Sequence, residues 1–373
     1  MRVSVLFFLS VVFCVSANAA TITGVSGTFS HGQTVTITGT GFGTKEQAAP
    51  MQYDDFEEGS SGAVLTTASG VSGWTEITSN NGSASYPHYS TAAAHSGSLG
   101  MSCNFDPPVY NSGVNLHNPA KFQHGMYLDA WLRYFRPQND TRSWKPWDMY
   151  GSSGGQGWGN PVIDWFGTCN GSLTFAGYTD IANPSGFSTS ISATLGSFTG
   201  AMHHLQIWAQ PNSPTGASNG VIRIVLDGTQ ILSRNDMMFI GAGSVNTWAR
   251  LAIGYYLSHD QQSQPGCLTP VGTGGAVHWD DIYVDNTQQR VEIGNAATYA
   301  GSTHREIQRP QTTWNDGAIQ IVVNTGTFGS GPAFLYVADS QNNINVNGFP
   351  ITIGATIPGD NVAPSAPSNL SVQ

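Results

Sequence analysis

The sequence predicts an all-β protein that contains more than one β-sandwich. Charged residues make up only 10% of its 373 residues, whereas glycines number 45 and aromatic residues reach 11%. Short runs of alternating apolar and polar residues recur, separated by glycine, asparagine and proline. This alternation is typical of half-buried strands, and no long amphipathic helical pattern occurs. The aromatic content excludes a disordered chain, and the length suits two or three domains.

The first 19 residues have the three parts of a signal peptide. Arg2 supplies the positive charge, and Val3 to Val15 form an apolar stretch too short to span a bilayer. Ala17-Asn18-Ala19 then offers small residues for cleavage. No later segment reaches the apolar length of a transmembrane helix. We therefore expect a protein that is secreted or held at the cell surface or in the periplasm, without membrane insertion.

Charge and cysteine content narrow the partners and the redox state. The formal net charge is −10 at pH 7, which disfavours nucleic acid as a partner. After the signal peptide three cysteines remain, namely Cys103, Cys169 and Cys267. Two of them can pair in an oxidising compartment, and we favour Cys169 with Cys267, although spacing alone leaves the pairing open. No Cys/His pattern has the spacing of a zinc site.

Residues 20–46 and 290–354 carry related strand patterns at opposite ends of the chain. The first segment resembles the opening of an IPT/TIG immunoglobulin-like domain, whose signature it matches at Gly32, Val35, Ile37, Gly39, Gly41, Phe42 and Gly43. The second segment resembles the later strands of the same module. The resemblance implies one discontinuous domain that receives the middle of the chain as an insertion, which proteins tolerate at loops with adjacent ends. The alternative is two unrelated β segments.

Residues 51–288 hold most of the strand patterns. Their opening, YDDFEEG, and their close, VHWDDIYVDN, resemble the first and last strands of concanavalin-like lectin/glucanase domains. A strand, a Pro/Gly/Ser/Asn loop and Val-Ile-Arg-Ile-Val-Leu-Asp-Gly resemble heparin lyase I-like proteins of this group. The resemblance implies a jelly-roll sandwich. Residues 355–373 have linker composition and end like the first strand of a fibronectin type III module, so the chain is either truncated there or ends in a vestigial tail.

Two strands of the central domain present aromatic and polar side chains on the same face. Alternation turns Tyr127, Trp131 and Arg133 away from the core in one strand, and His204, Gln206 and Trp208 in the other. Aromatic rings stack on sugar C–H faces, while polar groups hydrogen-bond to hydroxyls or carboxylates. Together with Tyr256 of a later strand, these residues are our carbohydrate-binding candidates. The alternative is an ordinary solvated sheet face.

Catalysis is a separate question. No Glu-x-Asp-x-Glu strand occurs, which argues against retaining hydrolysis, and we find no support for Ser-His-Asp catalysis. A polysaccharide lyase needs a group that neutralises a uronate carboxylate and another that moves the adjacent proton. If the chain is a lyase, we expect Arg133, Gln206, His204 and Tyr256 to be catalytic, and Arg250 and His259 are further residues of suitable type.

The concanavalin-like resemblance also implies a structural Ca²⁺ ion where the first and last strands meet. Glu57, Asp280 and Asp281 match the acidic positions there, and carboxylate oxygens suit Ca²⁺. The ion would stabilise the sandwich and take no part in chemistry. The alternative is that these residues are ordinary acidic strand ends.

We therefore predict a secreted polysaccharide-binding jelly roll within a cell-surface or extracellular assembly. One alternative is a lyase that cleaves a uronate-containing glycan by β-elimination. Another is a non-catalytic adhesive or structural protein that meets other extracellular proteins. A glycine-rich region, expected to be a loop, could roof a groove, bind a partner or form a small separate core through Trp144, Trp147, Tyr150, Trp158 and Trp165. The sequence leaves the glycan and the oligomeric state open.

Overall fold

A computed structural model describes residues 19–79, 86–104, 112–135, 143–152, 159–167, 172–178, 187–258, 275–354 and 356–357. The described chain is almost entirely antiparallel β-structure, and its strands form four sheets that pack as two sandwiches. Within those residues, no helix combines the length and apolarity that a transmembrane span needs. The predicted signal peptide, Cys169 and Cys267 lie outside them, and Cys103 is a buried free thiol.

The larger sandwich is the jelly roll. Its eight-stranded sheet has the order β15-β14-β13-β8-β17-β6-β5, and β3 also pairs with β17. These strands are β3 (Gln52–Asp54), β5 (His88–Ser90), β6 (Gly100–Asn104), β8 (Met126–Phe135), β13 (His203–Gln210), β14 (Gly220–Leu226), β15 (Thr229–Met237) and β17 (Ala276–Asp285). The seven-stranded sheet has the order β12-β11-β10-β9-β16-β7-β4. Its strands are β4 (Glu76–Ser79), β7 (Ser112–His117), β9 (Ser143–Gly151), β10 (Gly159–Gly167), β11 (Ser172–Tyr178), β12 (Phe187–Thr194) and β16 (Trp248–Ser258).

The core of the jelly roll lies between these two sheets. Leu128 and Ile207 face it from the eight-stranded sheet, and Trp147 and Ile253 from the other, all with 0% exposure. Packing of two inner faces in this way is how a sandwich buries its apolar side chains. The expected loop around Trp147 was wrong, because β9 and β10 form a hairpin there and Trp147 belongs to the main core. The side chains of Trp144, Trp158 and Trp165 lie outside the described set.

The smaller sandwich joins strands from both ends of the chain. Its five-stranded sheet has the order β20-β21-β2-β1-β24, and its four-stranded sheet the order β19-β18-β22-β23. The strands are β1 (Thr21–Thr28), β2 (Thr34–Thr40), β18 (Arg290–Gly294), β19 (Arg305–Ile307), β20 (Arg309–Asn315), β21 (Ala318–Val322), β22 (Gly331–Ala338), β23 (Phe349–Ile353) and β24 (Thr356–Ile357). In the register, Val35 lies opposite Ile321 and Ile37 opposite Ile319. All four side chains are fully buried in one core.

The predicted fold class is therefore confirmed: a jelly-roll sandwich plus a discontinuous immunoglobulin-like sandwich. The assignment of the smaller sandwich to IPT/TIG modules stays a prediction. We call it the immunoglobulin-like sandwich below.

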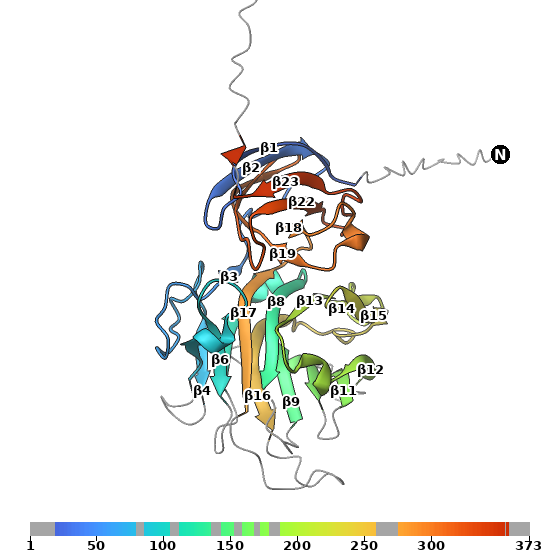
Figure 1. The fold of residues 1–373 in the computed structure, drawn as a ribbon. Helices are drawn as coiled ribbons and strands as arrows, with labels where there is room; N and C mark the ends of the chain where they lie inside the picture. Colours follow the sequence, from blue (N-terminus) through green and yellow to red (C-terminus); the bar gives the residue numbers. More distant parts are fainter. Residues whose placement is uncertain are drawn as a thin grey trace, which may run out of the picture.

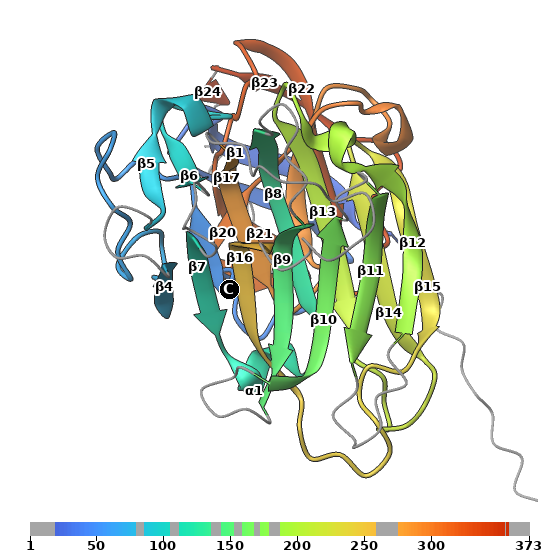
Figure 2. The same cartoon turned by 90° about the horizontal axis from the view of Figure 1, so that it is seen from below.

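The immunoglobulin-like sandwich packs on the outer side of the eight-stranded sheet (Figure 1). Seen from below, the seven-stranded sheet lies nearest the viewer, with the eight-stranded sheet and then the immunoglobulin-like strands behind it (Figure 2). A small apolar cluster connects the two bodies: Tyr53, Tyr127, Trp208, Tyr283 and Ile307. The two outer faces of the jelly roll therefore have different surroundings, and this difference determines where a ligand can bind.

Candidate functional site

The predicted sugar-binding face of β8 and β13 is covered by the immunoglobulin-like sandwich. Trp131, His204, Gln206 and Trp208 are 5–8% exposed. Trp131 donates from Nε1 to Glu306 Oε2 at 3.1 Å, and Gln206 donates from Nε2 to Glu292 Oε1 at 3.0 Å. These side chains thus fasten one sandwich to the other. We correct the interpretation of this face as an open groove, because the immunoglobulin-like sandwich covers it and supplies partners for its polar groups.

A buried hydrogen-bond network lies at the centre of this contact. Asp129 accepts from His204 Nε2 at 2.8 Å, from Gln206 Nε2 at 2.8 Å and from the Tyr127 hydroxyl at 3.0 Å. Burial lowers the pKa of His204, but the nearby Asp129 carboxylate outweighs burial, so the net pKa is raised. A protonated His204 suits a partner of Asp129 that holds the interface together.

The predicted lyase set does not converge on one face. Arg133, His204 and Gln206 lie on the eight-stranded sheet, whereas Tyr256 lies on β16 in the seven-stranded sheet. The jelly-roll core separates these two outer faces. Arg133 also has a structural use, because its Nη2 donates to the Ala92 carbonyl at 2.6 Å and to His278 Nδ1 at 3.0 Å. A site that combines Tyr256 with the other three residues is therefore wrong.

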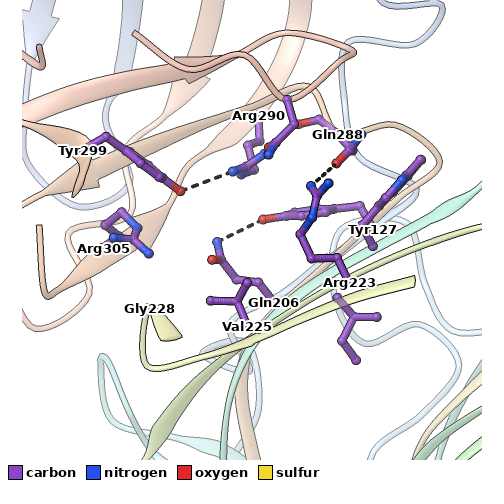
Figure 3. Close-up of a pocket in the computed structure, with 12 residues that line it drawn as sticks. Tyr127, Gln206, Arg223, Val225, Gly228, Gln288, Arg290, Tyr299 and Arg305 are labelled. Atoms are coloured by element: carbon purple, nitrogen blue, oxygen red, sulfur yellow. Dashed lines mark hydrogen bonds between the residues drawn. The ribbon is translucent and has the colours of Figure 1, made fainter. Parts of the chain in front are cut away.

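Part of the covered face opens into a pocket between the two sandwiches, with a volume of about 160 Å³ (Figure 3). Tyr127, Gln206 and Trp208 of the predicted set line it. The immunoglobulin-like segment and β14 add residues that sequence analysis missed: Arg223, Arg290, Tyr299 and Arg305. In Figure 3 Arg290 reaches the Tyr299 hydroxyl, and Arg223 reaches Gln288. Three guanidinium groups around one small space suit an anionic group, such as a carboxylate or sulfate.

The outer face of the seven-stranded sheet carries a polar row that crosses five strands. The register places Glu76 opposite Asn115, Asn115 opposite Ala252, Ala252 opposite Asp148, and Asp148 opposite Asp164. Directly opposed residues in antiparallel strands share a face. The neighbouring residues Trp147, Met149, Ile163 and Ile253 point into the core. The row therefore faces away from the core. A second, shorter row beside it contains His117, Arg250 and Tyr150.

On this outer face, one group of side chains is buried, and a second group beside it is half-buried. Asn115, Asp148, Asp164 and Arg250 are 0–7% exposed. Lys145, Tyr150, Glu76 and His117 are half-buried. The Tyr150 hydroxyl donates to Asp148 Oδ2 at 3.0 Å, Lys145 Nζ donates to Asp164 Oδ2 at 2.8 Å, and Arg250 pairs with Glu76. These contacts link the half-buried side chains to the buried ones and fix the orientation of both groups.

Burial and neighbouring charges change the pKa of Asp148. Burial, and then the negative charge of Asp164, raises the pKa of Asp148 well above its usual value, although Lys145 opposes this shift. Two buried carboxyl groups side by side cannot easily both ionise. A direct contact between the two carboxyl groups raises the pKa of Asp148 further. The raised pKa favours the protonated form of Asp148. His117 is held neutral, because burial, followed by the charge of Arg250, lowers its pKa.

Tyr256 lies opposite Lys145 in the register of β16 with β9. It is thus the one predicted carbohydrate-binding residue that belongs to this sheet, and its side chain lies outside the described set. Arg250, a further candidate from the sequence, lies on the same strand. His259 falls outside the described residues. Asp148 and Asp164 were missed, although each is a lone acid between core residues in consecutive strands, which is a signal that the sequence contains.

The three predicted calcium residues have different environments. Glu57 Oε1 accepts from the backbone N–H groups of Ser98 and Leu99 at 2.7 and 2.8 Å. Asp280 Oδ2 accepts from the N–H groups of His95 and Ser96 at 2.6 and 3.0 Å. Both carboxylates hold one loop through N–H donors, and this contact needs no ion. Calcium at Glu57, Asp280 and Asp281 remains a prediction; Asp281 has a different environment, described below.

No family model matches the chain, and no curated protein matches it. Among solved structures it is similar to an endo-β-1,4-glucuronan lyase from the fungus Trichoderma reesei, with 17% identity and a TM-score of 0.45, over 58% of this chain and 92% of that one. The alginate lyase Aly36B has 14% identity and a TM-score of 0.42, over 64% of this chain and 98% of its own. The cellulose-induced protein Cip1 has 16% identity and a TM-score of 0.38, over 63% and 97%. Identities this low assign no residue roles, which rest on the geometry above.

Proposed function

We propose that the chain binds a polysaccharide across the outer face of its seven-stranded sheet. The observation that carries this proposal is the polar row from Glu76 to Asp164, which crosses five adjacent strands. Strands lie about 4.8 Å apart, so the row is about 19 Å long. That length fits several sugar units of an extended chain lying across the strands.

The half-buried side chains of this face supply the contacts that a glycan needs. Lys145 donates hydrogen bonds, the neutral His117 ring and the Tyr150 hydroxyl can both donate and accept, and Glu76 accepts. Sugar hydroxyls need both kinds of partner along one line. The cations of Lys145 and Arg250 would attract a uronate carboxylate, although each is already paired with an acid. We therefore expect a glycan with some acidic units to bind better than a neutral one.

Affinity electrophoresis with neutral and acidic polysaccharides tests this proposal. Lys145→Gln should weaken retardation of the protein at least tenfold, because it removes a cation from the centre of the face. Lys121→Gln is the matched control: Lys121 is also a half-buried lysine in an ion pair, with 22% of its side chain exposed against 24% for Lys145. Circular dichroism would verify that both variants fold. Equal retardation of the two variants would refute binding at this face.

A second candidate function is lyase activity, which a specific observation favours. Tyr256 lies opposite Lys145, and Asp148, whose raised pKa favours its protonated form, lies in the same face. In β-elimination, Lys145 would neutralise a uronate carboxylate, and Tyr256, acting as its phenolate, would take the proton from C5 and become neutral. The C4–O4 bond then breaks as the C4=C5 double bond forms, and a proton from Asp148 ends on the leaving oxygen. Base, acid and charge-neutralising group are the three roles that this reaction needs.

Absorbance of the unsaturated uronate product separates the two functions. The protein would be incubated with a panel of anionic polysaccharides, with and without calcium. A lyase gives a rising trace that Tyr256→Phe abolishes while retardation in gels persists, whereas Lys145→Gln loses both. A flat trace with retained binding leaves a binding module. If trace and gels are both negative, an adhesive role towards protein partners replaces the glycan proposal.

A further inference from the structure

A histidine and two carboxylates from distant parts of the sequence meet where the two sandwiches touch. His95 follows a short 3₁₀ turn of the jelly roll, Asp281 lies on β17, and Glu306 lies on β19 of the immunoglobulin-like sandwich. One nitrogen of His95 and one oxygen of each acid all lie within 4.8 Å of one another. The His95 side chain is 6% exposed and that of Glu306 0%.

Asp281 is the member of this cluster whose hydrogen bonding is incomplete. It is fully buried. Its Oδ1 accepts from Asn324 Nδ2 at 3.0 Å and from the Tyr53 hydroxyl at 3.3 Å. Its Oδ2 has no hydrogen bond of ordinary length among the described residues, although the Ser96 hydroxyl interacts with this carboxyl group. A buried carboxylate oxygen with incomplete hydrogen bonding is costly, and such groups point to an ion or water that completes them.

The backbone at Asp281 is also strained. Its φ is +49°, a left-handed value that is uncommon for a residue other than glycine, and it lies in a break of the β17–β8 register between Asp280 and Tyr283. Strain of this kind persists where the surrounding structure imposes it, and it concentrates at functional sites.

The other two members are already oriented towards a common point. His95 Nε2 lies 2.9 Å from Glu306 Oε1, and Trp131 Nε1 donates to Glu306 Oε2 at 3.1 Å. The His95 ring stacks on the Trp131 ring with centroids 3.6 Å apart and planes at 10°. His304 Nε2 also lies 2.8 Å from Glu306 Oε1. Such outer contacts fix ligand orientation in metal sites.

We propose that His95, Asp281 and Glu306 bind one Zn²⁺ ion that joins the two sandwiches. One imidazole nitrogen with two carboxylate oxygens is a zinc donor set, with water in the fourth position. Ca²⁺ prefers six to eight oxygen ligands and fits this set poorly. Tetrahedral ligands about 2.1 Å from zinc are roughly 3.4 Å apart. Atoms at the 4.8 Å limit of the cluster would therefore have to approach by about 1.4 Å, whereas His95 Nε2 and Glu306 Oε1, which lie 2.9 Å apart, would separate slightly.

Isothermal titration of the full chain with zinc chloride, after removal of metals with EDTA, tests the proposal. We expect one zinc ion per chain and a rise in melting temperature that EDTA reverses. Glu306→Gln should lower zinc affinity at least tenfold and abolish this rise. His95→Gln, which changes a loop residue, gives the same test if the buried substitution prevents folding. Asp236→Asn, at an exposed carboxylate outside the cluster, is the control and should bind zinc like the wild type.

Three results would overturn the proposal. The first is an absence of zinc binding. The second is zinc binding that neither Glu306→Gln nor His95→Gln weakens, which would assign the signal to other histidines. The third comes from a parallel titration with calcium chloride: the wild type binds calcium more tightly than zinc, and Glu306→Gln weakens this calcium binding.

Discussion

Glu292 should be the ionisable group on which the contact between the two sandwiches depends most. It is 2% exposed. Its carboxylate accepts hydrogen bonds from Arg290 Nε at 2.5 Å and from Gln206 Nε2 at 3.0 Å, and it forms an ion pair with Arg305 Nε at 3.3 Å. Glu292→Gln keeps the shape of the side chain and removes its charge. The two arginines would then be buried without their counter-ion, a situation that typically costs about 3–5 kcal/mol.

The pKa of Glu292 gives a second estimate of how much this carboxylate contributes to the folding free energy. Burial alone would raise this pKa, but Arg290 and Arg305 outweigh burial and lower it from 4.5 to about 2. A fall of this size corresponds to roughly 3 kcal/mol of folding free energy. Because the pKa is lowered on folding, this stabilisation is complete above pH 4.5 and disappears as the pH falls towards 2. At pH 3.5 roughly 1 kcal/mol of it should already be lost.

Urea denaturation at pH 7 and at pH 3.5, followed by tryptophan fluorescence, measures both effects. The wild type should be about 3 kcal/mol more stable than Glu292→Gln at pH 7, and the gap should shrink at pH 3.5. Asp236→Asn is the control, because Asp236 also pairs with an arginine but is 57% exposed, and it should change nothing measurable. A variant as stable as the wild type at pH 7, or a gap that does not change with pH, would refute the reasoning.

Three further predictions concern the jelly roll. Leu128→Ala opens a cavity in the main core, where Leu128 is 0% exposed, and should cost about 2–5 kcal/mol in urea denaturation. Burial raises the pKa of the Cys103 thiol to about 12, so peptide mapping after treatment with iodoacetamide should find Cys103 alkylated only in the unfolded protein. If calcium binds at Glu57 and Asp280, Glu57→Gln should abolish any rise in melting temperature on adding calcium; an equal rise in the variant would exclude Glu57 as a ligand.

The fold could be predicted because strand alternation records which side chains a sandwich buries. Val35 and Ile37 were expected to share one face, and both are fully buried in β2. Leu128, Leu132 and Leu205 likewise occupy the core side of β8 and β13. Alternation with a period of two is a property of each strand alone, so it can be recognised in the sequence without knowing which strand pairs with it. The glycine pattern around Phe42 resembles the opening of an immunoglobulin-like module, and this resemblance predicted that the two ends of the chain form one domain.

The site could not be predicted in the same way, because alternation does not say what covers the outer face of a sheet. Trp131 and Gln206 look like groove residues, yet their partners Glu306 and Glu292 follow 175 and 86 residues later. An aromatic ring with a polar neighbour serves a domain interface as well as it serves a sugar. The choice between the two depends on long-range packing, on which a single strand carries no information.

The position of the immunoglobulin-like sandwich also limits which face of the jelly roll can act on a glycan. Covering the eight-stranded sheet satisfies Asp129, Gln206 and Trp131, and it leaves the row around Asp148 on the opposite side of the core. Arg290 and Arg305 lower the pKa of Glu292 to about 2, so these ion pairs persist at any pH above the acid range. Because this contact stays charged and paired, the covered face is not expected to open for a ligand at neutral pH. A polysaccharide that binds the jelly roll should therefore meet the seven-stranded sheet, held in a fixed orientation by the body on the other side.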